Sequence, residues 1–584
     1  MEINKSDNKA ISTHEKITFE IGGRKGNLLI SKDQCDTYFG KNHTIHLIGN
    51  ARAYSKDNLL TAKDIHDDFK GDVEQLYARL SGRFIMVIND HENEQMSVFN
   101  DHMGSMPFYY LCSENELLIS PTLNYIKQES AQTLALSSQA LFHYCYFHCI
   151  PAPTTIYEGV NKLSPAEHLL IKHSTVVSKG TLYCPEFQTE NAEPSLEEQC
   201  LSEIETAVSR SLSDNCGAFL SGGLDSSTVA GMLAKLSDSA KTYSVGFKEP
   251  GYDETEYALL TAKHFGTDHD AAYLEPEYIS ENFKLVASSF DEPFGNSSAL
   301  AAYFCASYAK SKGINSLLAG DGGDELFAGN SRYAKQKFFF PYEGLPGFIK
   351  AGLKLAFVRS PLAKVPGFSK VCSYINQAEN PLPDRLQAYN FLHRFPPSEI
   401  FTQEFLANVD TKQPLNQLRE RYKSAKAQSP IDNMLYMDWK FTLADNDLIK
   451  VSKMCELAGV DVKFPLLEKE LVDFSCKVPA NVKLPGQKLR DFFKQATRNF
   501  LAPATLSKSK HGFGLPFGRW MKSTPSLVEV TEQALTNLKS RNIVKAEFID
   551  KALTMQSEEH SAYYGELIWI LAVMELWLES RETA

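Results

Sequence analysis

The sequence predicts an α+β domain followed by an α/β domain whose C-terminal part is largely helical. Short apolar runs with alternating polarity, broken by turns, fill the chain from about residue 17 to 175, as half-buried strands do. From about residue 218, strand and helix patterns alternate, which is typical of a parallel sheet with crossover helices. Beyond about residue 335, strand patterns become rare. The expected domains are residues 1–185 and 195–584, on either side of a polar segment.

The first domain contains a series of expected strands and two expected helices. One helix is expected over Thr61 to Leu80, and another begins near Ser137. Because the strands are short and follow one another through turns, mainly antiparallel pairing is expected. The strand sequences are KITFEI, GNLLIS, TIHLIGN, RFIMVIND, QMSVFND and PFYYLC.

The second domain begins with strands and helices in turn. A helix is expected over Thr228 to Leu236, a strand over Thr242 to Phe247 and a second helix over Thr255 to Phe265. Near the C-terminus, Leu567 to Leu578 is the most apolar stretch, with glutamates around and within it. It is too short to span a bilayer, so we expect a buried helix.

Composition narrows the class of protein. The formal net charge of −12 disfavours broad binding to nucleic acid or to an anionic membrane, although a local basic patch is compatible with it. Eleven scattered cysteines, an odd number without regular spacing, fit reduced thiols in a cytoplasm. The polar start of the chain lacks the apolar core of a signal peptide. A cytoplasmic enzyme without nucleic-acid or membrane partners is expected.

The segment Ser221-Gly222-Gly223-Leu224-Asp225-Ser226-Ser227 joins an expected strand to an expected helix. Its glycines allow a close approach of the backbone to an anion, and the helix N-terminus adds positive partial charge. The serine hydroxyls can donate to phosphate oxygens. Asp225 would repel phosphate unless a cation such as Mg²⁺ lies between them. The alternative is a plain glycine turn, and a Walker loop is excluded because no lysine follows the glycines.

A second loop is rich in acids and glycines. Asp321, Asp324 and Glu325 fall within five residues of the stretch LAGDGGDELFAG. Three such carboxylates repel one another unless they are solvated or bound to a metal ion. The alternative is a solvated acidic turn.

The two loops together resemble the asparagine synthetase family, whose glutamine-hydrolysing members carry an N-terminal glutaminase half. The resemblance implies an Ntn-glutaminase-like αββα domain followed by a PP-loop synthetase domain. It also implies cleavage of ATP to AMP and pyrophosphate, and adenylation of a carboxylate that an amine or ammonia then attacks. ATP and Mg²⁺ are the implied cofactors.

The resemblance assigns roles to individual residues of this chain. Asp225 and Asp324 would share Mg²⁺, and Asp321 would lie near the reacting substrate as a catalytic residue. Lys510, in the late stretch LSKSKHGFGLPFGRW, would stabilise the oxyanion formed when the amine attacks. Lys488 would contact phosphate, with Arg490 as a second candidate. The residues implied to bind the nucleotide are Ser221, Gly222, Gly223, Leu224, Asp225, Ser226, Ser227, Val245, Gly246, Phe247, Gly320 and Lys488.

The glutaminase half resembles the family in its order of motifs but departs from it in its chemistry. Such domains use a cysteine at residue 2 as nucleophile, whereas this chain has Glu2 and no cysteine before Cys35. Arg52 stands where the family has an acid, although Asp101 is retained. We therefore expect no glutaminase activity. This loss is shared with the β-lactam synthetases and lasso-peptide cyclases, and it places the chain close to that branch.

The source of the amine stays open at this point. Free ammonia could be added to a small-molecule carboxylate, two separate molecules could be joined, or a small molecule or peptide could be cyclised by its own amine. A non-catalytic scaffold is the alternative of another class, although both nucleotide loops are intact. A tRNA-modifying or sulfur-transferring enzyme would be expected to carry basic surface or paired cysteines. A homodimer is the candidate assembly.

Overall fold

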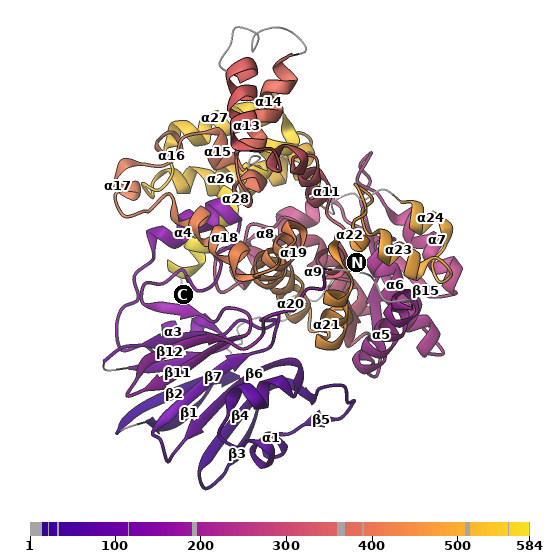
Figure 1. Ribbon diagram of the computed structural model, residues 1–584. Helices are drawn as coiled ribbons and strands as arrows, with labels where there is room; N and C mark the ends of the chain where they lie inside the picture. The colour runs from indigo at the N-terminus through magenta and orange to yellow at the C-terminus, as the bar shows by residue number, and fades with distance from the viewer. Residues whose placement is uncertain are drawn as a thin grey trace. The chain divides into compact units, whose positions relative to one another are not determined.

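The chain forms two compact units in the computed structural model (Figure 1). The first unit comprises Met1–Ser137 and Pro151–Tyr183, and the second comprises Ser138–Ile150 and Cys184–Ala584. Residues 138–150 thus belong to the second unit, although the chain on both sides of them belongs to the first unit. The structure describes residues 14–21, 23–31, 34–114, 116–189, 195–358, 368–387, 390–508, 514–558 and 560–582.

The first unit is a sandwich of two sheets. Its first sheet has the order β1 (His14–Ile21), β2 (Arg24–Ser31), β9 (Leu117–Ser120), β8 (Tyr109–Cys112), β10 (Val160–Lys162). Its second sheet has the order β12 (Thr175–Thr181), β11 (Glu167–Lys172), β7 (Gln95–Asn100), β6 (Leu80–Asp90), β4 (His43–Ala53), β3 (Cys35–Phe39), with β5 (Leu59–Leu60) paired to β4. All pairs are antiparallel except β2 with β9.

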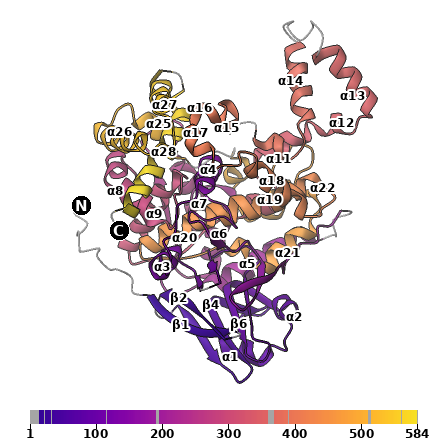
Figure 2. The same cartoon turned by 90° about the vertical axis from the view of Figure 1, so that its left-hand side faces the viewer.

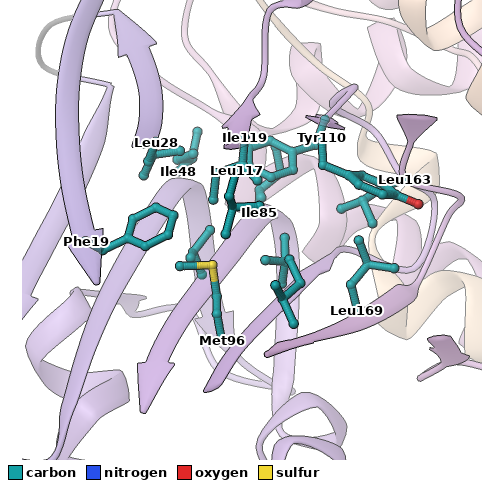
Figure 3. Close-up of a cluster of buried hydrophobic side chains, with 14 of the residues drawn as sticks. Phe19, Leu28, Ile48, Ile85, Met96, Tyr110, Leu117, Ile119, Leu163 and Leu169 are labelled. Carbon is teal, nitrogen blue, oxygen red and sulfur yellow. The ribbon is translucent and has the colours of Figure 1, made fainter. Parts of the chain in front are cut away.

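The core of the first unit lies between the two sheets. Inward-facing side chains alternate along the strands, such as Phe19 and Leu28 from the first sheet and Ile85 and Met96 from the second (Figure 3). Helix α3 (Leu123–Glu129) packs on the first sheet and α1 (Ala62–Asp68) on the second. The layers are therefore helix, sheet, sheet, helix, as the resemblance implies.

The expected helix over Thr61 to Leu80 is two shorter helices. Gly71 has a φ of +89°, and the chain turns there before α2 (Val73–Ala78) begins. The Asp72 carboxylate caps α2 by accepting a hydrogen bond from Gln75 N at 3.0 Å. The prediction of one helix was wrong because it relied on the spacing of apolar residues. That spacing continues across Gly71 and Asp72, where the chain turns and a new helix is capped.

The second unit is built on a parallel sheet of five strands. The strand order is β15 (Asp268–Tyr273), β14 (Lys241–Gly246), β13 (Cys216–Phe219), β16 (Ser316–Leu318), β17 (Asp461–Lys463). The chain starts at the middle strand, adds two strands on one side and then two on the other. The order therefore reverses between β13 and β16, which is where doubly wound sheets bind their ligands.

Helices flank this sheet in two groups. Helix α6 (Leu224–Leu236) contacts α5 (Leu196–Ser211) and α7 (Thr255–Phe265). Helix α9 (Ser298–Ser311) contacts α8 (Pro276–Ser289) and α20 (Leu448–Leu457). The expected strand at 242–247 is β14 shifted by one residue, and the expected helix at 255–265 is α7, so both predictions are confirmed.

The rest of the second unit is helical, as expected. After α10 (Gly323–Phe327), β17 is the only strand within the part of the chain that the structure describes. Helix α28 (Ser561–Glu582) is buried along Leu567–Leu578, which confirms the prediction of a buried C-terminal helix. Arg541 forms an ion pair with Glu575 inside this stretch at 2.5 Å. Among the described residues, no helix is both long enough and apolar enough to cross a bilayer.

Helix α4 (Ser138–Phe147) is the part of the second unit that precedes the main segment in sequence. The hydroxyl of its Tyr144 donates to the carbonyl oxygen of Ile570 in α28 at 2.7 Å. Gln139 Oε1 accepts from Asp410 N at 2.7 Å. These bonds, together with the apolar side chains of α4, fix this early segment to the C-terminal helices.

Candidate active site

A cleft of about 550 Å³ opens at the carboxyl ends of β13, β14 and β16. It lies where the strand order of the sheet reverses, so both neighbouring loops point into it. The loop that follows β13 and the loop that follows β16 supply much of its wall. The other walls come from α9, from residues 442–451 and from side chains at 490–508.

The loop after β13 is held in shape by its own serines. Ser221 Oγ and Ser226 Oγ lie 2.9 Å apart, and Ser221 N donates to Ser226 Oγ at 3.2 Å. Gly223 is the N-cap residue of α6, so Leu224, Asp225 and Ser226 form the first helical turn. The N-terminal backbone N–H groups of α6 therefore face the cleft, which is a favourable place for an anion.

Gly222 fixes the position of this loop against α7. Its φ is +68°, and a Cβ at this position would lie 2.4 Å from the backbone carbon of Tyr257. Only glycine satisfies both constraints without moving the backbone. Gly222 itself does not line the cleft, so its part is to place its neighbours.

Ser227 points away from the cleft. Its side chain is fully buried, and its Oγ lies 3.0 Å from Thr261 Oγ1 of α7. The structure thus places Ser221, Gly223, Leu224, Asp225 and Ser226 in the wall of the cleft, while Ser227 joins α6 to α7.

The loop after β16 packs tightly against the loop after β13. A Cβ on Gly320 would lie 2.7 Å from Ser226 N, and a Cβ on Gly323 would lie 2.3 Å from Asp225 Oδ1. The absence of side chains at these two glycines is what allows the two loops to touch. As a result, Asp225 and Asp324 reach the same corner of the cleft although 98 residues lie between them in the chain.

Arg490 lies between these two acids. Its Nη1 is 2.8 Å from Asp225 Oδ2 and 3.0 Å from Asp324 Oδ1. Arg490 is the N-cap residue of α23 (Asp491–Thr497), has a φ of +54° and is only 8% exposed. One buried guanidinium thus offsets the repulsion between the two carboxylates.

The acid pair fits a Mg²⁺ ion that is shared with phosphate. Asp225 Oδ1 is buried and has no hydrogen-bond partner among the described residues. An orphaned carboxylate oxygen next to a second carboxylate offers the oxygen ligands that Mg²⁺ prefers. The described residues contain no group of three or more His, Cys, Asp or Glu that could hold a metal ion alone. Phosphate oxygens and water would complete the coordination, as is common for Mg²⁺ bound with a nucleotide.

Asp321 lies in the same cleft beside a lysine–aspartate pair. Lys450 Nζ donates to Asp447 Oδ1 at 2.7 Å, and all three side chains line the cleft. Burial raises the pKa of Asp321 to about 6, while the nearby Lys450 opposes that rise. A carboxyl with a pKa near 6 can hold or release a proton close to neutral pH.

Lys508 is a buried cation at the first loop. Its Nζ donates to Ser221 O at 3.2 Å and forms an ion pair with Glu254 Oε2 at 3.1 Å. It also lies 4.6 Å from the ring centroid of Tyr257. In the sequence, Lys508 is one lysine of a basic run, and no local pattern distinguishes it as a residue of the cleft. Lys510 lies outside the described residues.

The segment expected to hold the adenine only partly lines the cleft. Val245 is in the wall, and Gly246 lies so close to β15 that a Cβ would be 2.7 Å from Tyr273 Cε1. Phe247 is buried, with its ring 6.0 Å from that of Trp520. Lys488 is exposed and lies outside the wall, whereas Arg490 lies in it.

Two family models match the chain. Residues 200–579 match the model for asparagine synthase, and residues 68–182 match the model for a glutamine amidotransferase domain.

Curated relatives match most of the chain at low identity. The glutamine-hydrolysing asparagine synthetase 1 of Bacillus subtilis (strain 168) is 24% identical over 519 residues, which cover 86% of this chain and 78% of that protein. A putative glutamine-hydrolysing asparagine synthetase of Mycobacterium tuberculosis (strain H37Rv) is 22% identical over 86% of this chain and 77% of its own length. A putative enzyme of the same description from Methanocaldococcus jannaschii is 29% identical over 66% of this chain and 74% of its own length.

Proposed function

The chain belongs to the asparagine synthase family, and on this premise we propose that it forms an amide bond at the cost of ATP. ATP is cleaved between its α and β phosphates, a carboxylate is activated as an acyl-adenylate, and pyrophosphate leaves. Ammonia or an amine then attacks the activated carbonyl and AMP is released. The first domain is a glutamine amidotransferase domain by family and by its αββα layers.

The meeting of two distant loops at Asp225 and Asp324 carries this proposal. The loop after β13 offers backbone N–H groups and hydroxyls to a phosphate chain, and the acids beside it suit the cation that accompanies a triphosphate. When bound, Mg²⁺ would neutralise charge on the leaving pyrophosphate. The two acids would hold that ion, and Arg490 would remain as a further cation next to the same phosphates.

Roles for the remaining groups follow from their places in the cleft. Asp321 lies beside Lys450 and is the candidate to hold a proton next to the reacting amine. Lys508 keeps the first loop in position through Ser221 O. Lys510, which stands two residues further along the chain, would donate to the oxyanion, as its position in the family motif implies.

We further propose that the first domain does not hydrolyse glutamine. Cys35 lies within strand β3, and burial raises the pKa of its thiol, which makes it a poor nucleophile. Arg52 stands in β4 where the family has an acid. The retained Asp101 is buried and accepts hydrogen bonds from Met103 N and Ser105 Oγ, so its carboxylate is engaged within its own turn.

The nucleotide products test the reaction. With [α-³²P]ATP and a set of candidate carboxylates and amines, we expect AMP and pyrophosphate. ADP with orthophosphate as the products would contradict the proposal. Parallel reactions supplied with ammonium, with glutamine or with an organic amine identify the nitrogen donor, and glutamate released from glutamine above the blank would refute the loss of glutaminase activity.

A further inference from the structure

A second cavity, of about 330 Å³, lies beside the cleft within the same unit. Thr442, in the irregular helix η4 (Trp439–Asp447), lines both the cleft and this cavity. Asn446 of the same helix lines the cavity and accepts a hydrogen bond at 2.7 Å from Asn296, which lines the cleft. The two spaces are therefore separated by one layer of small polar side chains.

Aromatic rings form much of the cavity wall. Phe147 and Phe441 stack with their centroids 5.1 Å apart, and Tyr146 and Tyr563 add two further rings. A wall with several aromatic rings can bind apolar groups, and the ring faces also attract cations. The cavity therefore suits an organic molecule, and it is much larger than ammonia requires.

The charges in the wall favour a cation. Arg332 lines the cavity but is neutralised by Asp438 at 2.5 Å. Glu566 also lines it, and within the described part of the chain its carboxylate accepts one hydrogen bond, from Ser297 Oγ at 3.3 Å. No ion pair joins Glu566 to a basic side chain among the described residues. A carboxyl group in this position gains a partner when an ammonium group binds.

We propose that this cavity binds the amine substrate, an organic amine with an aromatic or apolar body whose ammonium group pairs with Glu566. This inference rests on the ligase function proposed above and names its nitrogen donor. The amine end would lie toward Thr442 and Asn446, which separate the cavity from the cleft.

Ligand-observed NMR without ATP, at pH 8 where the Glu566 carboxyl is ionised, tests the site. The probes are 2-phenylethylamine and its uncharged isostere 2-phenylethanol. The amine is expected to bind at least about tenfold more tightly than the alcohol, and Glu566→Gln is expected to remove that difference. Glu532→Gln, an exposed acid on α26 (Pro525–Lys539), is the matched control and should leave it unchanged. Equal binding of both probes, no binding of either, or an unchanged preference in Glu566→Gln would overturn the proposal. Because no ATP is present, these outcomes are independent of whether pyrophosphate is released.

An independent observation concerns a helical arm formed by residues 347–358 and 368–379. Helices α13 (Gly347–Leu353) and α14 (Phe368–Glu379), with the π-helical turn η1 (Lys354–Val358), stand out from the other helices of the second unit (Figure 2). Helix α14 turns Cys372, Ile375 and Ala378 inward. No side chain of α13 or η1 is fully buried, although Leu353, Phe357 and Val358 pack in part against the cluster that contains Ile375.

Large apolar side chains of this arm face solvent. Phe348 is 78% exposed and Leu355 is 67% exposed, and their spacing of seven residues places them on one side of the helical stretch. Ile349, Phe368 and Val371 are exposed as well. Such a cluster is unusual for a surface that meets only water.

The charge of the arm differs from that of the whole chain. Residues 347–379 contain five basic residues and one acid, Glu379, which pairs with Lys354 at 2.5 Å, in a chain with a net charge of −12. Exposed apolar side chains among lysines are the pattern of helices that lie in the headgroup region of anionic bilayers. Self-association through this surface would bring like charges together, which disfavours a second copy as the occupant.

We infer that this arm docks on an anionic membrane surface through Phe348, Leu355 and their neighbours. The negative net charge of the chain disfavours broad membrane binding, but it is compatible with a local basic patch such as this one. The side chains would enter only the headgroup boundary, because no described helix of the arm is long and apolar enough to span a bilayer.

Sedimentation with lipid vesicles tests this surface. We expect the protein to bind vesicles of phosphatidylcholine with about 30% phosphatidylserine, to bind pure phosphatidylcholine weakly, and to be released at high salt. The double substitution Phe348→Glu and Leu355→Glu should lower binding at least about tenfold. Phe39→Glu, at a residue 74% exposed on β3, is the matched control. Equal binding to both vesicle types, an unaffected double variant, or a salt-independent dimer that the double variant dissociates would overturn the inference.

Discussion

Asp225 and Asp324 meet at a single nitrogen atom, Arg490 Nη1, which lies 2.8 Å from one carboxylate and 3.0 Å from the other. Through this contact the turn after β13, the turn after β16 and the start of α23 are joined at one point. Two acids and one base leave a net negative charge at this corner of the cleft. This negative charge favours the binding of a divalent cation. Arg490 holds the two carboxylates close together before the cation binds.

The first prediction concerns this acid pair. Mg²⁺ with ATP should raise the Tm of the protein, because a ligand that binds only the folded state stabilises it. Asp225→Asn should lose most of that Tm shift and should abolish pyrophosphate release. The substitution removes the negative charge of the side chain, and the orphaned Oδ1 becomes either an amide nitrogen or an uncharged amide oxygen. Asp214→Asn, at an exposed acid before β13, is the control. An equal Tm shift in Asp225→Asn would show that the ion binds elsewhere.

The second prediction concerns Arg490. Arg490→Ala leaves two partly buried carboxylates facing each other, and it should lower the free energy of unfolding by about 3 kcal/mol. Arg490→Lys keeps the charge but cannot reproduce the geometry of the guanidinium, so a smaller loss is expected. Urea denaturation without nucleotide measures both. If added Mg²⁺ restores part of the stability of Arg490→Ala, the ion occupies the space between the acids.

The third prediction uses two glycines with the same backbone conformation. Gly222 has a φ of +68° and a backbone neighbour 2.4 Å from its hypothetical Cβ, whereas Gly251 has a φ of +83° and open space around it. Gly251→Ala should cost only the backbone strain of about 1–2 kcal/mol. Gly222→Ala should cost more and should also weaken ATP binding, as measured by thermal shift with nucleotide. Equal effects of the two substitutions would mean that the contact with Tyr257 is easily relieved.

Much of the fold is readable from local pattern. The run of residues 255–265 forms α7 because its apolar spacing, its acidic first turn and its basic last turn agree, and Gly266 ends it with a φ of +69°. The helix expected from Thr228 actually begins at Leu224. Ser226 and Asp225 suit a turn as well as the first turn of a helix, and the packing of Gly320 against Ser226 N accompanies the helical turn that forms there. Local propensity cannot report such a long-range contact.

The same limit applies to the site. Asp225, Asp321 and Asp324 could be found because acids close to glycines form a visible pattern. Arg490 and Lys508 reach the cleft from loops more than 250 residues beyond Asp225, and nothing in the immediate neighbours of Lys508 marks it. Lys488 and Arg490 are both candidates for phosphate contact in the sequence, yet the structure exposes Lys488 and buries Arg490 two residues later. Which side of a short loop faces a cleft is decided by tertiary packing.

The fourth prediction separates two lysines of one segment. Lys508→Ala removes charge-assisted hydrogen bonds to Ser221 O and Glu254, so the first loop loses an anchor and the KM for ATP should rise about tenfold. Lys510→Ala should leave ATP binding nearly unchanged and slow amide formation about 10²-fold. Steady-state kinetics, together with nucleotide binding measured in the absence of the acceptor, distinguishes the two. A higher KM for ATP in Lys510→Ala, together with slower amide formation in Lys508→Ala, would contradict the prediction and exchange the roles of the two lysines.

The fifth prediction concerns Glu566 and pH. Burial raises the pKa of Glu566 in the folded protein to about 7, above its ordinary value of 4.5. The folded state therefore holds a proton that the unfolded state has lost, and this stabilising contribution is fully present below pH 4.5 and is lost as the pH rises through 7. Glu566→Gln cannot ionise and lacks this dependence. The free energy of unfolding of the variant relative to wild type should rise by on the order of 2 kcal/mol between pH 5 and pH 8. Urea denaturation at the two pH values measures the difference, with Glu532→Gln as the control. A difference that stays constant with pH would show that Glu566 is ionised throughout, as it would be if a cation already held it.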